Sequence, residues 1–189
     1  ESWQSFNSTD SSMNNIYSIA TQLFDFGGSK AGGSGTGGGG CFVAGTQIAM
    51  YDDTLRSIED IHVSDLIWGY DLETKTKVKN TVIKTKRIEV TELVDIVHGT
   101  KTLTTTRDHP IFVIGKGWTS LDPDQTLVIH GIEAVEYELD DAVLTLDGTV
   151  EQITSITLRD VAPTSVYNLN SVSPSHNFYA DNILVHNKR

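Results

Sequence analysis

Cysteine and basic residues are scarce in this sequence. A single cysteine, Cys41, occurs among 189 residues, which excludes an intramolecular disulfide, so side-chain packing must hold the core together. The chain has 14 Lys and Arg against 25 Asp and Glu, a net charge of −11. Binding of nucleic acid through its phosphates requires clustered basic residues. We therefore expect no nucleic acid among the partners of the chain and interpret its acidity as favouring solubility.

Long hydrophobic runs are also missing. The longest uninterrupted apolar stretches are a few residues, whereas a membrane-spanning helix needs about 20. No charged-then-apolar leader and no lipidation motif is visible. We expect no membrane partner and no targeting signal, and nothing in the sequence indicates a compartment.

Composition divides the chain into regions. Residues 1–26 contain one predicted helix, which ends at Gly27 and carries apolar residues at helical spacing: Ile16, Ile19, Ala20, Leu23 and Phe24. Residues 27–40 hold nine glycines in fourteen positions, a composition typical of a flexible linker. We interpret residues 1–26 as an upstream host segment, 27–40 as a linker, 41–187 as the folded domain and 188–189 as downstream flanking residues.

From residue 41 onward the sequence predicts an all-β domain. Short segments rich in Val, Ile and Thr alternate with turn residues such as Asp147 and Gly148. The expected strands are 46–50, 66–70, 78–86, 93–97, 101–105, 111–114, 126–129, 142–146, 150–158, 165–169 and 183–185. One helical turn is expected, over residues 57–61. Many short strands at this spacing are typical of antiparallel hairpins.

Cys41 lies where the linker meets the first expected strand. A lone buried cysteine is most often a small core residue. At this position, however, the thiol can reach back to the carbonyl of Gly40, and glycine has no side chain to obstruct attack. Cys41 is therefore a candidate nucleophile with its target in the same chain.

Two further stretches carry candidate residues. Thr106 and His109 are three residues apart, and Pro110 fixes the backbone directly after the histidine. The chain closes with His186 and Asn187, ten residues after a second His-Asn pair at 176–177. Each stretch is common in unrelated proteins, so the order of all three along the chain is what carries information.

That order resembles the Hint superfamily, and it is most similar to mini-inteins and bacterial intein-like domains. The matching positions are Cys41, Thr106, His109, His176, His186 and Asn187, with further similarity at residues 41–46 and 167–169. The resemblance covers residues 41–187. It implies a horseshoe fold of short antiparallel strands, with the helical segment and the glycine-rich linker outside it.

The residues at the opening end suit rearrangement of the Gly40–Cys41 amide into a thioester. Amide resonance resists this reaction, and a free thiol with a pKa of about 8.5 is mostly protonated. We expect His109 to protonate or hydrogen-bond the departing Cys41 nitrogen. We expect Thr106 to donate to the Gly40 carbonyl oxygen as charge builds there. The family resemblance implies the same two roles.

At the closing end, the Asn187 side chain can attack its own carbonyl, form a succinimide and release Lys188. His186 is expected to polarise that carbonyl and His176 to assist proton transfer. Inteins that splice carry Cys, Ser or Thr after the closing Asn, and Lys188 stands there instead. The expected outcomes are therefore cleavage at either end, or ligation in which an amine attacks the thioester.

The remaining histidines and tryptophans match no motif. His62, His98 and His130 are expected on the surface or in loops, and the tryptophans in packing positions. Asn168 stands where many relatives have Asp, which puts an auxiliary carboxylate role in doubt. With one cysteine and scattered histidines there is no metal-ligand spacing, so we expect neither a metal nor a cofactor.

Other functions were weighed against self-processing. A Cys–His hydrolase acting in trans would need a substrate cleft, for which short strands leave little room. Transfer of the upstream segment to a sterol would leave His186 and Asn187 without a use. A β-rich spacer of a surface or phage-type protein would have no activity. We favour a monomer that acts once, in single turnover, on its own flanking segments, with water, an external thiol or an amine as acceptor.

Overall fold

The computed structural model describes residues 39–187. The helix and host segment predicted over residues 1–26, the linker up to residue 38 and the flanking residues 188–189 lie outside the described residues. The domain boundaries at 26, 40 and 187 therefore stay predictions.

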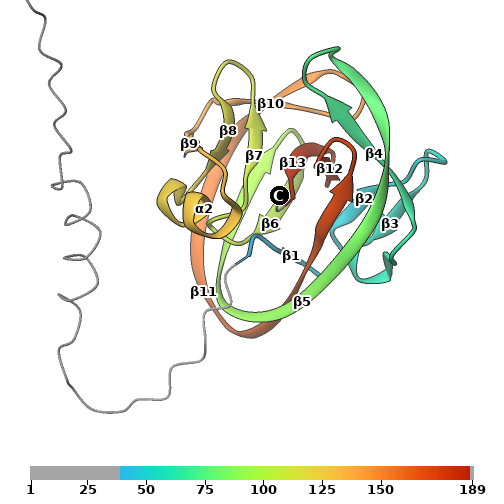
Figure 1. The fold of residues 1–189 in the computed structure, drawn as a ribbon. Coiled ribbons are helices and arrows are strands. Elements are labelled where there is room, and N and C mark those ends of the chain that lie inside the picture. The colour runs from blue at the N-terminus through green and yellow to red at the C-terminus, as the bar shows by residue number, and fades with distance from the viewer. Residues whose placement is uncertain (1–38, 188–189) are drawn as a thin grey trace, which may run out of the picture. The chain divides into compact units, whose positions relative to one another are not determined.

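The described chain is all-β, as predicted, and is organised around two long antiparallel strands. Strand β5 (Thr76–His98) pairs with β11 (Val150–Ser173) from Thr81↔Ser173 to His98↔Ile153. In Figure 1 these strands sweep around the shorter ones as a curved frame. Bulges bend β11, with register shifts between Ile153 and Ser155 and between Asp160 and Thr164, and bulges increase local bending and twist.

The shorter strands complete one sheet, ordered β3-β2-β12-β13-β7-β10-β11-β1-β6-β5-β4, with β8 paired to β7 and β9 paired to β8. The strands of the first part of the chain are β1 (Phe42–Val43), β2 (Gln47–Ala49), β3 (Leu55–Ser57), β4 (Leu66–Asp71), β6 (Lys101–Thr105), β7 (Ile111–Val113) and β8 (Gly117–Ser120). Those of the second part are β9 (Val135–Glu136), β10 (Ala142–Leu144), β12 (Asn177–Ala180) and β13 (Ile183–His186). The helical turn expected near residues 57–61 is the short 3-10 helix η2 (Ile58–Asp60).

One strand prediction is wrong. The segment 126–129 lies inside the helix α2 (Pro123–His130). Its Thr-Leu-Val-Ile residues favour a strand, but the caps decide otherwise. The Asp122 side chain accepts from Gln125 N, Pro123 fixes the first turn, and Gly131 ends the helix in the left-handed region at φ 68°.

Two other predictions broke continuous strands into pieces. Segments 78–86 and 93–97 belong to β5, and 150–158 and 165–169 belong to β11. Pro163 lies between the two predicted segments of β11. In the structure that stretch is a register shift between Asp160 and Thr164, which accommodates a proline because the ladder is interrupted there.

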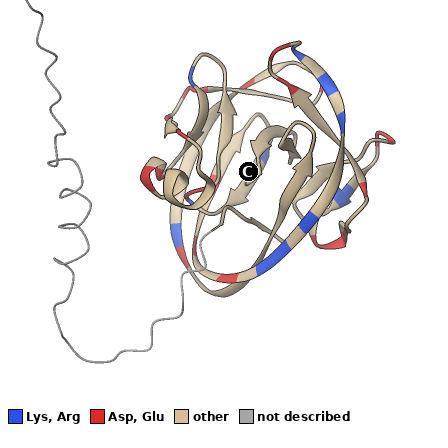
Figure 2. Cartoon of the chain, in the orientation of Figure 1, with Lys and Arg blue, Asp and Glu red and all other residues tan. Residues whose placement is uncertain are grey.

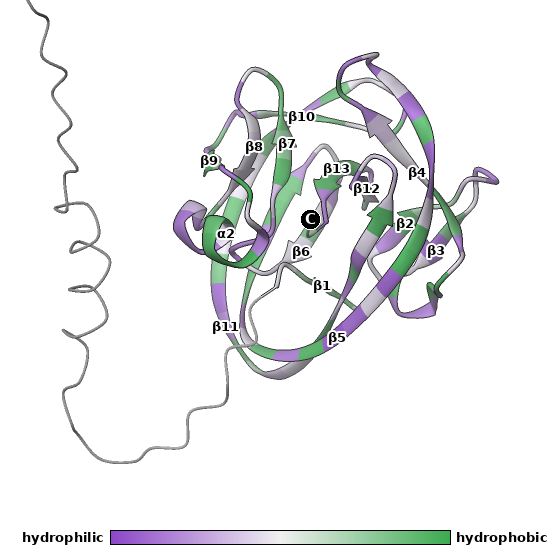
Figure 3. Cartoon of the chain, viewed as in Figure 1, coloured by the Kyte–Doolittle hydropathy of each residue, from purple (hydrophilic) through white to green (hydrophobic). Residues whose placement is uncertain are grey.

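The main hydrophobic core lies inside the frame. Basic residues are concentrated on one of the two long strands, β5. Figure 3 shows hydrophobic positions alternating with hydrophilic ones along β5 and β11, as expected for strands with one buried face. Phe42 and Phe178 meet edge-on in the core with ring centroids 6.0 Å apart. Figure 2 shows several basic residues along β5. The Lys86 side chain on this strand reaches Gly39, since its Nζ would lie 3.0 Å from a β-carbon there.

Candidate functional site

The sheet brings the three sequence motifs to one place. Phe42 of β1 pairs with Thr105, directly before the Thr-x-x-His stretch. Val185 of β13 pairs with Ile111, directly after that stretch. The His186 amide also donates to the Pro110 carbonyl at 3.0 Å. The first strand, the central motif and the last strand therefore meet around residues 105–111.

Hydrogen bonds hold the Cys41 backbone on both sides. Its carbonyl accepts from Thr106 N at 3.0 Å and from Thr105 Oγ1 at 2.9 Å. Its amide donates to Thr106 Oγ1 at 3.1 Å. We expected the Thr106 hydroxyl at the Gly40 carbonyl oxygen, but here it contacts the nitrogen of the Gly40–Cys41 bond. No sequence motif pointed to the contribution of Thr105.

The Cys41 thiol is fully buried and donates to the Gly39 carbonyl at 2.6 Å. Burial raises the pKa of the thiol to about 12, since a desolvated thiolate is costly. The Lys86 ammonium offsets part of this effect, and the Asp108 carboxylate adds to it. At neutral pH the group is therefore a thiol, and its reaction requires a base that takes its proton.

His109 is buried against the start of the chain. Its ring lies 4.1 Å from the Phe42 ring centroid, and a β-carbon at residue 40 would overlap its Nδ1 and Cα. The pKa of His109 is lowered to about 3, mainly by burial and in part by nearby His130, while Asp108 and the Gly40 backbone oppose the shift. Neither ring nitrogen has a hydrogen-bond partner of good geometry among residues 39–187. His109 is thus a neutral imidazole with unused proton-accepting capacity.

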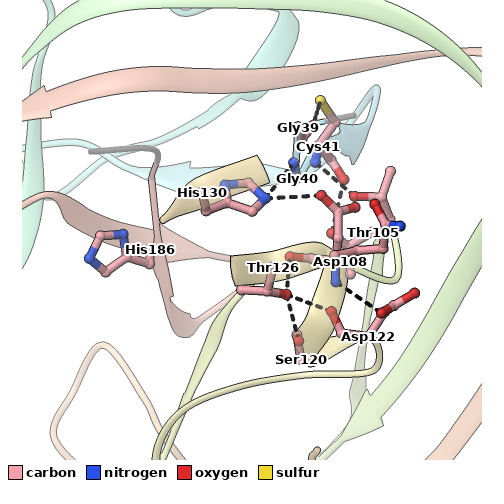
Figure 4. A network of polar contacts seen from close by, with 12 residues as sticks. Gly39, Gly40, Cys41, Thr105, Asp108, Ser120, Asp122, Thr126, His130 and His186 are labelled. Carbon is pink, nitrogen blue, oxygen red and sulfur yellow. Dashed lines mark hydrogen bonds and ion pairs between the residues drawn. The ribbon is translucent and has the colours of Figure 1, made fainter. Parts of the chain in front are cut away.

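Two residues outside the predicted set complete this end of the site. His130, at the end of α2, places Nε2 3.0 Å from Gly40 N and 2.9 Å from Asp108 Oδ2. Figure 4 shows one nitrogen of this ring joined by dashed lines to Gly40 and to Asp108, with the Cys41 sulfur pointing away from the ring. Asp108 lies inside the Thr-x-x-His stretch, so that motif could have pointed to it. No sequence motif includes His130, which reaches the site only through the position of α2.

The surface prediction for the unassigned histidines is therefore wrong for two of the three. His130 is buried in the site, and His98 is buried with Nδ1 2.7 Å from Glu151 Oε2. His62 is exposed, as predicted. The difference follows from strand register and helix position, which the sequence pattern at a single histidine does not encode.

At the closing end, His186 and Asn187 are both buried. His186 Nδ1 makes a short contact with the Asn187 carbonyl oxygen, and the Trp118 ring lies perpendicular to the imidazole at 4.6 Å. The Asn187 amide donates to the His176 carbonyl at 3.0 Å, and its Nδ2 reaches the Asn170 carbonyl at 3.5 Å. The Asn187 carbonyl thus already contacts an imidazole able to polarise it.

His176 and Asn177 contribute in different ways. The His176 side chain is exposed, and its backbone has a positive φ of 57°. Asn177 is buried and locks this turn, because its Oδ1 accepts from Tyr70 N at 2.7 Å and its carbonyl accepts from Asn80 Nδ2 at 2.7 Å. The turn therefore holds the carbonyl that positions Asn187.

Other features of the described residues limit the chemistry of the site. Asn168 is buried, and neither of its side-chain amide atoms has a hydrogen-bond partner among the described residues. Within residues 39–187, no group of three or more His, Cys, Asp or Glu could hold a metal ion. In the same part of the chain, no helix is long and apolar enough to cross a membrane.

Solved structures of inteins and of an intein-like domain share this fold. The bacterial intein-like domain from Clostridium thermocellum is 30% identical, with a TM-score of 0.66 over 78% of this chain and 98% of that one. The DnaB intein from Synechocystis sp. PCC 6803 is 21% identical, with a TM-score of 0.61 over 79% of this chain and 99% of that one. The gp41-1 intein is 19% identical, with a TM-score of 0.59 over 79% of this chain and 100% of that one.

One family model also matches. It is described as the Ataxin-1 and HBP1 module (AXH), and it matches residues 42–148. That match begins after Cys41 and ends before β11, β12 and β13, so it covers neither end of the candidate site. No curated protein sequence matches the chain.

Proposed function

The chain belongs to the bacterial intein-like domains of the Hint superfamily, and over residues 42–148 to the AXH module family, and we propose that it processes its own backbone. The two proposed points of reaction are the Gly40–Cys41 bond and the bond after Asn187. One observation carries the proposal: strands β1, β7 and β13 bring Cys41, His109 and Asn187 around a single stretch of sheet. Its natural substrates are its own flanking segments.

The first step is an N–S acyl shift. The Cys41 sulfur forms a bond to the Gly40 carbonyl carbon, the bond from that carbon to the Cys41 nitrogen breaks, and the thiol proton ends on the nitrogen as an amine. The sulfur now donates to the Gly39 carbonyl, so a rotation about the Cys41 side chain must precede attack. The product is a thioester that links residue 40 to Cys41.

His109 is assigned to the proton transfer. It is neutral because its pKa is about 3, so it acts first as a base for the thiol and then as an acid for the leaving nitrogen. General acid–base catalysis of this kind contributes roughly 10²–10⁴-fold in rate. The Thr106 hydroxyl contacts the Cys41 nitrogen and steadies it as the bond to Gly40 breaks.

The second step is cyclisation of Asn187. Its Nδ2 attacks its own carbonyl carbon, the bond to the Lys188 nitrogen breaks, and the proton lost from Nδ2 passes to that departing amine. His186 contacts the oxygen on which charge develops, which stabilises the transition state. We assign a smaller part to His176, whose carbonyl fixes Asn187 and whose imidazole is exposed.

Lys188 decides the fate of the thioester. Transesterification to a downstream residue needs a thiol or hydroxyl directly after Asn187, and Lys188 has neither. A lysine side-chain amine is ordinarily protonated at neutral pH, which makes it a poor nucleophile. The thioester therefore passes to water, to an external thiol or to an amine, and the reaction ends in cleavage or in ligation by aminolysis.

Mass spectrometry of the purified chain tests this function. Incubation with a small thiol should release residues 1–40 as a thioester, and incubation without it should release Lys188-Arg189. Cys41→Ala should abolish the first product only, and Asn187→Ala the second only. A wild-type chain that stays intact under both conditions after long incubation would exclude the function and favour a spacer.

A mixing experiment separates this function from a hydrolase acting in trans. The Cys41→Ala chain, incubated with an excess of wild type, should stay uncut at residue 40. Wild-type cleavage should follow first-order kinetics with a rate constant independent of protein concentration, as expected for a monomer that reacts once. Cutting of the variant chain by wild type would instead indicate turnover on other proteins.

A further inference from the structure

The two amides that flank the first reaction point are tied to the same carboxylate. The Gly40 N–H contacts His130 Nε2 at 3.0 Å, and His130 Nε2 lies 2.9 Å from Asp108 Oδ2. On the other side, the Cys41 N–H donates to the Thr106 hydroxyl at 3.1 Å, and that hydroxyl forms a hydrogen bond with the Asp108 carboxylate. Asp108 therefore closes a ring of contacts around the Gly40–Cys41 peptide.

The ring is built inside the protein. Asp108 is 6% exposed and His130 is 2% exposed. Burial raises the pKa of the Asp108 carboxyl, but its hydrogen bonds with His130 and Thr106 outweigh that effect and hold the pKa below its usual range. A buried carboxylate is costly unless donors satisfy it. Its two donors are the same groups that contact the amides on either side of the reaction point.

His130 Nε2 lies within hydrogen-bonding distance of two partners, the Gly40 N–H and the Asp108 carboxylate. When His130 Nε2 carries a proton, it donates to Asp108 and cannot accept from the Gly40 N–H. When Nε2 carries no proton, its single lone pair is available to the Gly40 N–H, and it has nothing to donate to the Asp108 carboxylate. His130 Nε2 is thus the one atom that joins Gly40 to Asp108, and an alanine at position 130 opens the ring.

We propose that Asp108 and His130 are positioning residues for the first reaction, an inference that rests on the proposed function. His130 fixes the Gly40 amide, so the carbonyl of the same residue stays aligned for the Cys41 sulfur. Asp108 orients the Thr106 hydroxyl so that its lone pair faces the Cys41 nitrogen. The closing end uses His176, His186 and Asn170, so its reaction does not depend on the ring.

The ratio of the two cleavages tests the inference. In Asp108→Asn and His130→Ala, thiol-dependent cleavage at residue 40 should slow at least tenfold, while release after Asn187 should stay within about twofold. His130→Gln should restore most of the first rate, because a glutamine oxygen can accept from the Gly40 N–H while its amide donates to Asp108. Asp124→Asn and His62→Gln, both at exposed positions, serve as controls and should match wild type.

A measurement independent of activity uses the full chain with Cys41→Ala. The Gly40 amide proton should be protected from exchange with solvent, and His130→Ala should remove that protection while His130→Gln keeps it. Unchanged cleavage at residue 40 in both ring variants would overturn the inference. So would a parallel fall of both cleavages with the melting temperature, which would mean a folding role. An inert wild type would count against the proposed function itself, and the exchange result would still decide whether His130 holds Gly40.

Discussion

Burial sets the chemistry of individual residues at the opening end of the site. Desolvation holds Cys41 as a thiol with a pKa of about 12 and His109 as a neutral imidazole with a pKa of about 3. A thiolate–imidazolium pair is therefore strongly disfavoured in the resting chain. The proton must pass from sulfur to nitrogen as attack occurs, which predicts a slow reaction and a precursor that persists long enough to be isolated.

The depressed pKa of His109 predicts acid sensitivity. The unfolded chain takes up a proton on this histidine near pH 6.5, whereas the folded chain resists it until about pH 3. The contribution of neutral, buried His109 to the free energy of unfolding is therefore fully present above about pH 6.5. It is lost as pH falls toward 3. Each pKa unit corresponds to about 1.4 kcal/mol, so the loss by pH 4 should be on the order of 3 kcal/mol.

Urea unfolding of the Cys41→Ala chain between pH 4 and 8 measures this effect. His109→Gln has no titrating group at that position, so its free energy of unfolding should vary less over the acidic range. His62→Gln, at an exposed position, should follow the parent. Equal slopes for the parent and His109→Gln would show that His109 is not the source of the pH dependence.

Gly40 gives a second prediction at this scale. A β-carbon there would overlap His109 Nδ1 and the His109 backbone, so Gly40→Ala should displace the imidazole and slow thiol-dependent cleavage at least tenfold. Gly39→Ala is a matched control, because its β-carbon would meet only the end of the Lys86 side chain at 3.0 Å. That flexible chain can move aside. Equal cleavage by the two alanine variants would contradict the assigned place of His109.

At the residue scale, the order of the motifs along the chain was the informative part of the sequence. Cys41, His109 and the closing His186 and Asn187 lie around one stretch of sheet, as the chemistry requires, although their roles stay proposals. His130 was missed because its contact with Gly40 spans 90 positions of sequence. No local pattern encodes a contact of that range.

At the scale of elements, capping residues and bulges explain the wrong predictions. The segment 126–129 has strand composition, yet Leu127 and Val128 remain 52% and 80% exposed on α2, so their hydrophobicity is not used for burial. Asp122, Pro123 and Gly131 carried the helix signal. The pattern of hydrophobic residues alone therefore misled, whereas the helix-boundary residues were informative.

The turn before β12 gives an element-scale prediction. Gly69 on β4 lies so close to this turn that a β-carbon would overlap Asn80 Nδ2 and approach the Asn177 carbonyl. Gly69→Ala should push the turn away and move the His176 carbonyl that holds Asn187. Overpacking of this kind costs about 1–3 kcal/mol.

Release after Asn187 should therefore slow more than cleavage at residue 40 in Gly69→Ala. Thermal melting and mass spectrometry of both cleavages measure the two effects. Thr85→Ala, an exposed substitution on β5, controls for general effects on the strand pair. A variant that melts earlier but loses both cleavages in equal measure would contradict a specific role for this turn.

At the scale of the whole molecule, the site exists only when the sheet is complete. Its residues come from the first strand, from the connection between β6 and β7, and from the last strand. Strand pairing makes them neighbours, because β1 pairs with β6 and β13 pairs with β7. No piece of the chain shorter than residues 41–187 contains all three. Both cleavages should therefore depend on the same cooperative folding transition.

Urea provides the measurement. As its concentration rises, the rates of thiol-dependent cleavage at residue 40 and of release after Asn187 should fall together, with a midpoint equal to that of unfolding followed by circular dichroism. The closing Asn187 is held by the turn at 176, and the opening Cys41 is held by Thr106. Fraying of only one of these two ends would slow only the cleavage at that end. Coincident midpoints would establish one folded unit that carries both reactions. If one cleavage persisted at urea concentrations where the sheet has unfolded, that reaction would not need the shared site, and the assignment of its residues would fail.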